Sequence, residues 1–457
     1  MKQLPFFDRH DEIKRIYRTL RSADSSLIVI FGRRRCGKSR FLQQVVQDRD
    51  IYYLADTRET ALQIKTLADE IAKKIPEFNS VAYPSWDSLF SMLNTRAKPG
   101  IALVLDEFPY LVQQYPPLTS IIQKLIDGRP SFHMVICGSS QRMMQGMALD
   151  SSSPVYGRAT EIIKIQPLEA GWITKALAVK DIPAIEAYSV WGGVPRYWEL
   201  AAQFNDLQEA VSDMVFDAHG VLHEEPQRLL LDDMRSATQP HSVLSLIANG
   251  CHRLSEIAGR LGKPGPNLSH PLNTLVELGY IRREVPFGES VKSTKRTLYA
   301  LNDPFLLFWY RFVHPNRSAL ELGRTKGVIA ECKRFFPSHV GFVWEELARR
   351  STAFLEINGV HFKPGQRFWG PGMDGVPIEV DVVAESIDGK HVLFGEAKWE
   401  EKTDLGACHA ALMKAAGQIP HLSGKNRHFV YWLKHPPKKI EGESLVIGPS
   451  QILEAMR

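Results

Sequence analysis

The sequence predicts an α/β protein built from more than one domain, and three observations support this fold class. Mostly apolar runs at residues 27–31, 101–105 and 132–137 indicate strands, and the first leads through a glycine-bounded loop into a helical pattern. Apolar residues at helical spacing over residues 254–278 indicate a separate small helical core. Residues 377–398 indicate two more strands joined by a turn, and therefore a further α/β unit.

Composition narrows the class of protein. The length of 457 residues exceeds what one hydrophobic core supports, and 44% hydrophobic with 23% charged residues is typical of globular rather than disordered chains. The net charge of +5 permits an anionic partner such as nucleic acid without requiring one. Five scattered cysteines without CxxC spacing, no apolar signal core and no apolar run of bilayer length predict a cytoplasmic protein with reduced thiols and no membrane partner.

A phosphate-binding loop is the strongest motif in the chain. Residues 32–39 match GxxxxGK[ST] between a predicted strand and a predicted helix. Glycines allow backbone N–H groups to surround phosphate oxygens, Lys38 can reach the β- and γ-phosphates, and Ser39 can ligate Mg²⁺. We therefore expect ATP with Mg²⁺ as cofactors. The residues expected to form the nucleotide site here are Gly32, Arg33, Arg34, Arg35, Cys36, Gly37, Lys38, Ser39 and Arg40.

Three consecutive arginines, Arg33 to Arg35, exceed what phosphate binding by Lys38 requires. Their side chains could form a solvated basic face or make a dedicated contact with an anion. We favour the solvated face, because runs of charge are usually exposed.

Two further strand ends carry polar residues that suit hydrolysis. Asp106 follows the second strand, where it can hold the Mg²⁺ shell, and Glu107 can orient or deprotonate the attacking water. Ser139 and Ser140 follow the third strand and either hydrogen-bond the γ-phosphate or form an ordinary turn. Hydrolysis of ATP, and not only binding, is therefore predicted.

Residues 6–200 resemble the archaeal-type P-loop ATPases related to the STAND and AAA+ groups. The resemblance rests on FFDRHDEIKRI, GRRRCGKS, LDEFPYL, CGSS, VYGR and WGGVPRYW. It implies a parallel sheet with helices on both faces over residues 1–166 and a helical lid over residues 167–235. It also implies that Arg158 contacts the γ-phosphate across a subunit or domain boundary, and so a homo-oligomer, although an arginine after glycine is as often a surface residue.

Residues 236–315 resemble a winged helix-turn-helix, with three short amphipathic helices followed by two strands around a polar loop. Residues 267–278 would be the recognition helix. DNA binding is expected, but the module could equally serve as a packing spacer, since the recognition helix itself has little basic charge. The flanking basic residues that could contact phosphates are Arg260, Lys263, Arg282, Arg283, Lys292, Lys295 and Arg296.

Residues 301–315 are densely aromatic and aliphatic. Such a run could stack on bases, but its apolar density favours a helix packed between domains. Residues 316–326 are expected to be a linker to the last domain.

Acids and a lysine cluster near the C-terminus. Glu396 and Lys398 are two residues apart in a predicted strand, so both side chains leave the same face. A hairpin turning at Asp388-Gly389 would bring Asp381 beside Glu396. Half-exposed strand charges are ordinarily solvated, but the flanking apolar residues make unpaired carboxylates costly here.

Residues 327–457 resemble nucleases of the PD-(D/E)XK kind, and so a C-terminal α/β restriction-endonuclease-like domain. The matching residues are Asp381, Glu396 and Lys398, with Glu345 as an additional acid; Val380 stands where these nucleases often have proline. Asp381, Glu396 and Glu345 are hard oxygen ligands for Mg²⁺ or Mn²⁺, and Lys398 would orient or deprotonate water or neutralise the transition state. A basic stretch with Lys434, Lys438 and Lys439 either lines a DNA groove or is solvated.

These motifs predict an ATP-hydrolysing, DNA-binding protein with a metal-dependent deoxyribonuclease domain, in which the nucleotide state regulates DNA engagement or cleavage. The main alternative is an ATP-switched DNA-binding or regulatory protein whose nuclease-like fold is inactive. A signalling ATPase with protein partners has the least support.

Overall fold

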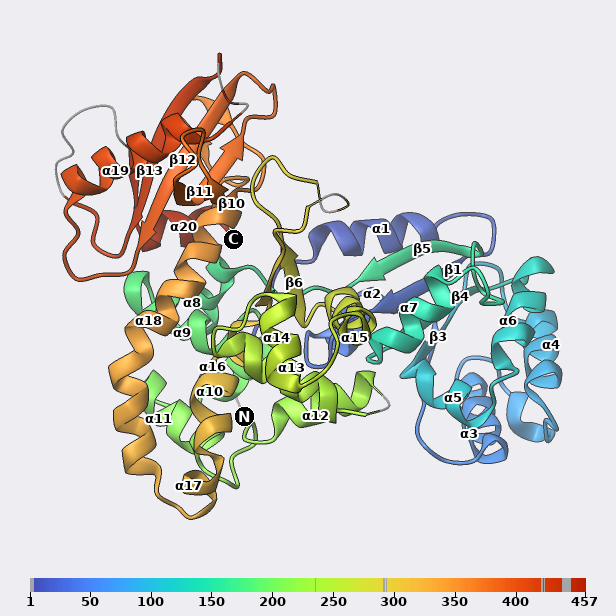
Figure 1. Ribbon diagram of the computed structural model, residues 1–457. Helices are drawn as coiled ribbons and strands as arrows, with labels where there is room; N and C mark the ends of the chain where they lie inside the picture. Colours follow the sequence, from blue (N-terminus) through green and yellow to red (C-terminus); the bar gives the residue numbers. More distant parts are fainter. Residues whose placement is uncertain are drawn as a thin grey trace.

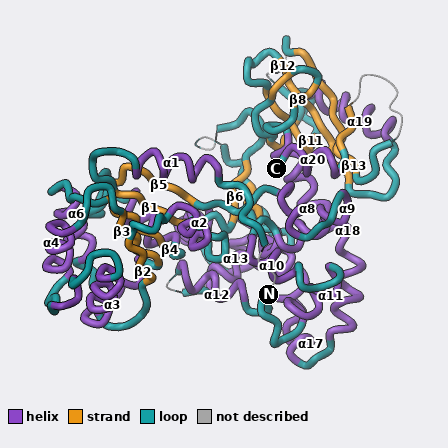
Figure 2. The backbone as a smooth tube through the Cα atoms, turned by 180° about the vertical axis from the view of Figure 1, so that it is seen from behind, coloured by secondary structure: helices purple, strands orange, loops and turns teal. Residues whose placement is uncertain are grey.

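The computed structural model describes residues 4–457 apart from residues 235, 291, 293, 421, 423 and 438–444. Two five-stranded sheets lie at opposite ends of the molecule, and helices fill the region between them (Figure 1). Viewed from behind, the helical middle separates the two groups of strands (Figure 2). Among the described residues, no helix has both the length and the apolar character needed to cross a bilayer.

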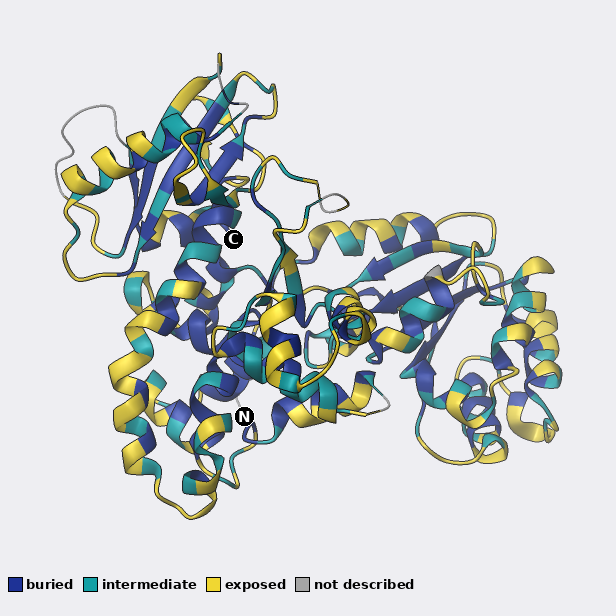
Figure 3. Ribbon diagram, in the orientation of Figure 1, coloured by how far each residue is buried: buried dark blue, intermediate teal, exposed yellow. Residues whose placement is uncertain are grey.

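The N-terminal sheet is parallel throughout, with strand order β2-β3-β4-β1-β5. Its central strands are completely buried (Figure 3), as expected when helices cover both faces. One face packs on α1 and α2, and the other on α3 to α7, so the predicted arrangement is confirmed. The elements are β1 (Leu27–Phe31), β2 (Ile51–Leu54), β3 (Ala102–Asp106), β4 (His133–Gly138), β5 (Ala159–Lys164), α1 (His10–Leu20), α2 (Lys38–Val45), α3 (Thr60–Ala72), α4 (Trp86–Arg96), α5 (Phe108–Gln114), α6 (Leu118–Asp127) and α7 (Gln141–Leu149).

Short helices and a two-stranded wing form the middle of the molecule. The helices after the first sheet are α8 (Ile173–Ala176), α9 (Asp181–Trp191), α10 (Pro195–Ala201), α11 (Leu207–Val211) and α12 (Glu225–Asp233). The helix-turn-helix unit follows as α13 (Thr238–Ala248), α14 (Leu254–Leu261), α15 (Pro266–Glu277) and the antiparallel strands β6 (Ile281–Glu284) and β7 (Leu298–Leu301). The apolar residues predicted to form its core are Ile257, Leu268, Leu272, Leu275 and Leu278, which are buried, and Leu254 and Leu261, which pack against them partly buried. Helix α15 is the predicted recognition helix.

The aromatic run folds as α16 (Pro304–Phe308) and a π-helical turn (Trp309–Val313), and its large side chains are buried, as the helix-packing interpretation predicts. The predicted linker at residues 316–326 is wrong in part. It contains α17 (Arg317–Glu321), and the 27-residue helix α18 (Thr325–Ser351) already begins inside it. A five-residue helix is too short to leave a periodic pattern in the sequence.

The C-terminal sheet is mixed, with strand order β10-β11-β12-β13-β14. The first two pairings are antiparallel and the last two are parallel. Apolar side chains of α18 pack on one face and those of α19 on the other. The remaining elements are β8 (Glu356–Ile357), β9 (Val360–His361), β10 (Gln366–Pro371), β11 (Pro377–Glu385), β12 (His391–Lys398), α19 (Leu405–Gln418), β13 (Asn426–Leu433), β14 (Leu445–Ile447) and α20 (Pro449–Ala455).

Candidate functional site

The glycine-bounded loop after β1 has the backbone that phosphate binding needs. Gly32, Arg35 and Gly37 all have positive φ, and a Cβ on Gly32 would lie 2.3 Å from the carbonyl oxygen of Ile165. The buried Lys38 ammonium donates to the carbonyl oxygens of Gly32 at 2.9 Å and Arg33 at 3.2 Å. Helix α2 begins at Lys38, so its N-terminal amides and dipole face the loop. The residues present therefore fit a nucleotide phosphate.

Three strand ends converge beside this loop. Because β3, β4 and β1 are neighbours in a parallel sheet, the residues that follow them share one edge. Asp106 is buried at the end of β3, where the Tyr52 hydroxyl donates to its Oδ2 at 2.7 Å and the Glu107 amide to its Oδ1 at 2.9 Å. Burial and the Asp106 charge raise the pKa of Tyr52, so this hydroxyl remains a donor.

The second acid is positioned by the end of β4. Glu107 has φ 51°, and its Oε2 accepts the Ser139 hydroxyl at 2.9 Å and the Ser139 amide at 3.4 Å. Ser139 therefore fixes the Glu107 carboxylate, a link that the sequence did not predict. Ser140 is buried and precedes α7, whereas Ser39 is exposed on the first turn of α2.

The loop arginines contact carboxylates from distant segments. Arg33 pairs with the buried Asp303, at the start of α16, and its own side chain is only 12% exposed. Arg35 lies 3.0 Å from the buried Glu225 of α12. The favoured interpretation of a solvated basic face is therefore wrong for Arg33 and Arg35, because the buried carboxylates of Asp303 and Glu225 neutralise their charges. The other two loop pairs are Arg34 with Asp232 at 2.8 Å and Arg40 with Glu199 at 2.9 Å.

Arg158 lies at the opposite edge of the sheet. It precedes β5, whose Ala159 pairs with Leu27 at the start of β1, one strand length away from the loop. Its guanidinium forms two hydrogen bonds to Asp127, at 2.8 and 3.0 Å. Arg158 therefore does not reach the nucleotide loop of its own chain, and a γ-phosphate contact would have to be made with a neighbouring molecule.

The C-terminal hairpin forms where it was predicted. β11 and β12 pair antiparallel with Val382 opposite Gly395, and Gly389 in the turn has φ 73°. The buried Asp381 accepts the Ala397 amide at 3.0 Å, so its carboxylate lies beside the Glu396–Lys398 segment. Lys398 Nζ lies 2.5 Å from Glu396 Oε1. Burial and the Asp381 charge raise the pKa of Glu396.

Glu345 approaches this cluster from α18. Burial, assisted by the Asp381 charge, raises the pKa of Glu345 to about 7. Arg349, one turn later, lies 3.8 Å from Glu345 and donates to the Asp381 carbonyl oxygen at 3.2 Å.

The carboxylate oxygens of Asp381, Glu396 and Glu345 are not all within 4.8 Å of one another. Among the described residues, the set whose ligating atoms all lie within 4.8 Å of one another is a different one: His223, Glu224 and Glu321. The physical reason is that Lys398 holds Glu396, and a backbone amide holds the Asp381 carboxylate.

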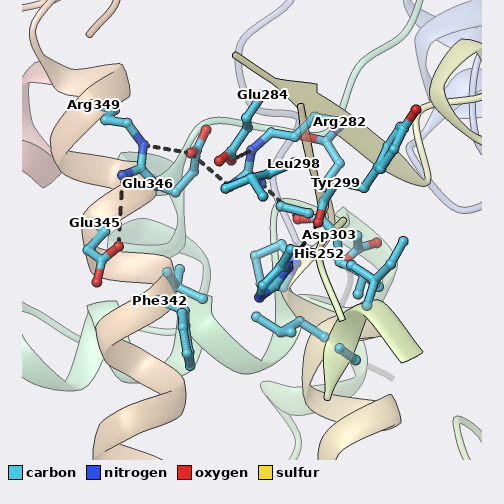
Figure 4. Close-up of a pocket in the computed structure, with 18 of the residues that line it drawn as sticks. His252, Arg282, Glu284, Leu298, Tyr299, Asp303, Phe342, Glu345, Glu346 and Arg349 are labelled. Carbon is cyan, nitrogen blue, oxygen red and sulfur yellow. Dashed lines mark hydrogen bonds and ion pairs between the residues drawn. The ribbon is translucent and has the colours of Figure 1, made fainter. Parts of the chain in front are cut away.

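A cavity of about 430 Å³ separates the wing from α18 (Figure 4). Glu346 accepts from Arg349 at 3.3 Å on one side and lies 3.1 Å from Arg282 of β6 on the other. Figure 4 shows Arg349 between Glu345 and Glu346. The expectation that Arg282 contacts DNA phosphate is therefore wrong for this arrangement, because its guanidinium pairs with Glu284 and Glu346 inside the protein.

A second, larger groove of about 950 Å³ runs between the wing and strands β10 and β11. It is rich in basic side chains, and β11 also carries Asp381. Lys292 and Lys295 of the predicted phosphate-binding set are exposed, as are Arg260 and Lys263, whereas Arg296 pairs with Glu289. Lys434 bonds to Glu401, and Lys438 and Lys439 lie outside the described residues. The charged and aromatic residues lining the groove are Arg253, Arg283, Lys295, Arg296, Tyr299, Arg367, Trp369 and Glu379.

Three family models match the chain. Residues 6–200 match an ATPase domain predominantly from Archaea, and residues 242–285 match an IclR helix-turn-helix domain. Residues 309–409 match a family described as Archaea bacterial proteins of unknown function. The chain thus carries an archaeal-type ATPase domain and a helix-turn-helix.

Individual proteins resemble it over most of its length. An uncharacterized protein of Methanocaldococcus jannaschii, MJECL04, is 32% identical over 411 residues, which cover 87% of this chain and 88% of that protein. The Walker-type ATPase PABY2304 of Pyrococcus abyssi has a similar fold, with a TM-score of 0.52 and 21% identity over 67% of this chain and 96% of its own. The ORC2 protein of Aeropyrum pernix is more distant, with a TM-score of 0.45 and 15% identity over 70% of this chain and 97% of its own.

Proposed function

This chain belongs to the same family as MJECL04 of Methanocaldococcus jannaschii, and from that premise we propose that it is an ATP-regulated, DNA-binding protein whose C-terminal domain cleaves DNA with a divalent metal. The observation that carries the proposal is the basic groove, because it leads from the wing onto the strand that holds Asp381 beside Glu396 and Lys398.

For the ATPase step, the chain supplies Lys38 as the cation, Asp106 as a metal ligand and Glu107 as the base. Lys38 would exchange its loop carbonyls for β- and γ-phosphate oxygens, and Ser39 and Asp106 would hold Mg²⁺, which neutralises phosphate charge when bound. Glu107 would orient or deprotonate the attacking water. Its hydrogen bond to Ser139 supports this role, because it holds the carboxylate at the edge of the sheet where the phosphates are expected.

Nucleotide binding would be communicated through the loop arginines. Arg33, Arg34 and Arg35 connect the phosphate loop to α12 and to the segment that follows the wing. Phosphate oxygens compete with carboxylates for guanidinium groups, because both accept the same paired hydrogen bonds. Binding of ATP would therefore loosen the contacts that fix the wing against the ATPase domain.

For DNA cleavage, Asp381 and Glu396 would hold Mg²⁺ or Mn²⁺, with Glu345 as a third carboxylate, and the metal would stabilise charge on the scissile phosphate. Burial disfavours the charge of Lys398, but the Glu396 carboxylate outweighs this effect and raises the pKa of Lys398 above its ordinary value. A charged Lys398 suits stabilisation of the transition state better than it suits proton abstraction.

A binding-only protein is the second candidate. It is favoured by the hydrogen bonds of Asp381 and Glu396 to groups of the protein itself, since these bonds must be exchanged before both acids can ligate one ion.

Incubation of supercoiled plasmid with Mg²⁺ or Mn²⁺, with and without ATP, separates the two candidates. The wild type should nick the plasmid, and Lys398→Ala should reduce nicking by at least about a hundredfold if the lysine stabilises the transition state. Lys402→Ala, an exposed lysine four residues away, is the matched control and should retain activity. DNA retention without nicking by the wild type under every metal condition would favour the binding-only protein.

A further inference from the structure

We propose a transition-metal site of the zinc class, formed by His223, Glu224 and Glu321 where the lid meets α17. It is separate from the nucleotide and C-terminal acid sites and does not depend on the proposed function. The ligating atoms of these three residues lie within 4.8 Å of one another. His223 and Glu224 directly precede α12, whereas Glu321 is the last residue of α17, about a hundred positions later in the sequence.

The spacing of the His223 and Glu321 ligand atoms is close to that of two ligands around one bound ion. Ligands at zinc distances in a tetrahedral arrangement stand about 3.3 Å from one another. His223 Nε2 lies 3.8 Å from Glu321 Oε1, so a side-chain adjustment of a few tenths of an ångström would bring both onto one ion. Glu321 is half exposed and can make that adjustment.

His223 is already oriented as a ligand. Its Nδ1 lies 2.9 Å from the carbonyl oxygen of Val215, and because a carbonyl only accepts, Nδ1 must carry the proton. In the neutral imidazole, which is the form that binds a metal, the lone pair is then on Nε2. Within the described part of the chain this buried nitrogen has no hydrogen-bond partner, and the side chain is 1% exposed. A buried polar atom without a partner is uncommon, and an imidazole held by a carbonyl through its other nitrogen is the usual arrangement of a metal ligand.

The surroundings hold the His223 ligand in place. The Trp309 indole donates to the His223 carbonyl oxygen at 2.7 Å, which fixes the backbone at this point. Arg317 contacts Glu224 and lies 3.6 Å from Glu321. Two carboxylates and one guanidinium leave one net negative charge, to which a divalent ion is attracted.

The donor set selects the class of metal. A neutral imidazole nitrogen with two carboxylates suits Zn²⁺, whereas Mg²⁺ and Ca²⁺ prefer oxygen ligands alone. Glu321 faces solvent, so water can fill a fourth position. Because the ligands join the lid to the helix that precedes α18, the ion would stabilise this junction rather than perform chemistry.

Zinc binding by the full-length protein, after EDTA treatment and without nucleotide, tests the site. We expect one Zn²⁺ ion that is sensitive to Glu321→Gln, with affinity at least about tenfold weaker in the variant, since removing even an outer partner of a ligand costs that much. Arg317→Met should strengthen binding, because it releases both carboxylates. Replacing Zn²⁺ by Co²⁺ in the wild type should give visible absorption bands that Glu321→Gln weakens.

Glu331→Gln is the matched control, because this acid lies on the neighbouring helix α18 and bonds to Asn316 outside the cluster. Zinc affinity equal in the wild type, Glu321→Gln and Arg317→Met would refute the site and leave the cluster as an ion pair with Arg317. His223→Gln should abolish binding, and its far-ultraviolet circular dichroism shows whether the variant has folded.

Discussion

At the scale of single residues, positions that depend on local sequence were predictable. Lys38 was predicted from the GxxxxGK[ST] loop, and Asp106 and Glu107 from the end of a strand pattern, because the strand ends of a parallel sheet share an edge. The partners of the loop arginines were not predictable, because Glu225 and Asp303 lie far along the chain and an isolated acid produces no periodic signal.

The hydrogen bond between Ser139 and Glu107 leads to a prediction about turnover. Ser139→Ala should lower the kcat of ATP hydrolysis by roughly ten- to a hundredfold with little change in KM, because a hydrogen bond to a charged group contributes about 1.5–3 kcal/mol. Steady-state phosphate release measures the effect. Ser139→Thr keeps the hydroxyl and should retain most of the activity. An equal loss in both variants would contradict a positioning role for the hydroxyl.

At the scale of elements, strands and the hairpin were predictable, whereas short helices were not. Alternating apolar residues and the Asp388-Gly389 turn predicted β11 and β12 with the correct pairing direction. The segment before α18 looked like a linker because Gly323, with φ 70°, ends a helix of only five residues. Which half of α18 packs against which neighbour depends on tertiary contacts that no local pattern contains.

The buried His339 in the middle of α18 predicts how stability changes with pH. Burial lowers the pKa of His339 to about 3 from an ordinary value near 6.5, so the folded protein binds fewer protons than the unfolded chain between these values. Stability should therefore fall as the pH drops below 6.5, by up to about 1.4 kcal/mol per pH unit.

Urea unfolding at pH 7 and pH 5 measures this dependence. In His339→Gln the fall between the two pH values should be smaller, because the group that resists protonation is gone. His270→Gln, an exposed histidine of α15, should leave the pH dependence as it is in the wild type. An undiminished fall in His339→Gln would assign acid sensitivity to other groups.

At the scale of the whole molecule, the arginine contacts join the phosphate loop to α12 and to the segment after the wing, which the sequence predicts as separate units. Glu225→Gln should raise ATP affinity by roughly tenfold, because Arg35 loses its charged partner and becomes available to phosphate. Titration with a fluorescent ATP analogue measures the change. Glu209→Gln, a surface acid of α11, should not alter it. Unchanged or weaker ATP binding in Glu225→Gln would show that Arg35 does not exchange partners.

Helix α18, which continues through Pro337, connects the helical middle of the molecule to the C-terminal sheet and so gives such a change a path. Its middle contacts α9, where the His339 ring bonds to the Ser189 carbonyl oxygen, and its last turns contact β11, where Arg349 donates to the Asp381 carbonyl oxygen (Figure 1). With 27 residues it is about 40 Å long, so a tilt of about 10° at the lid end would displace the other end by about 7 Å. A rotation that starts in the helical middle of the molecule would therefore reach the C-terminal sheet enlarged, and would change the orientation of the acids that this sheet carries.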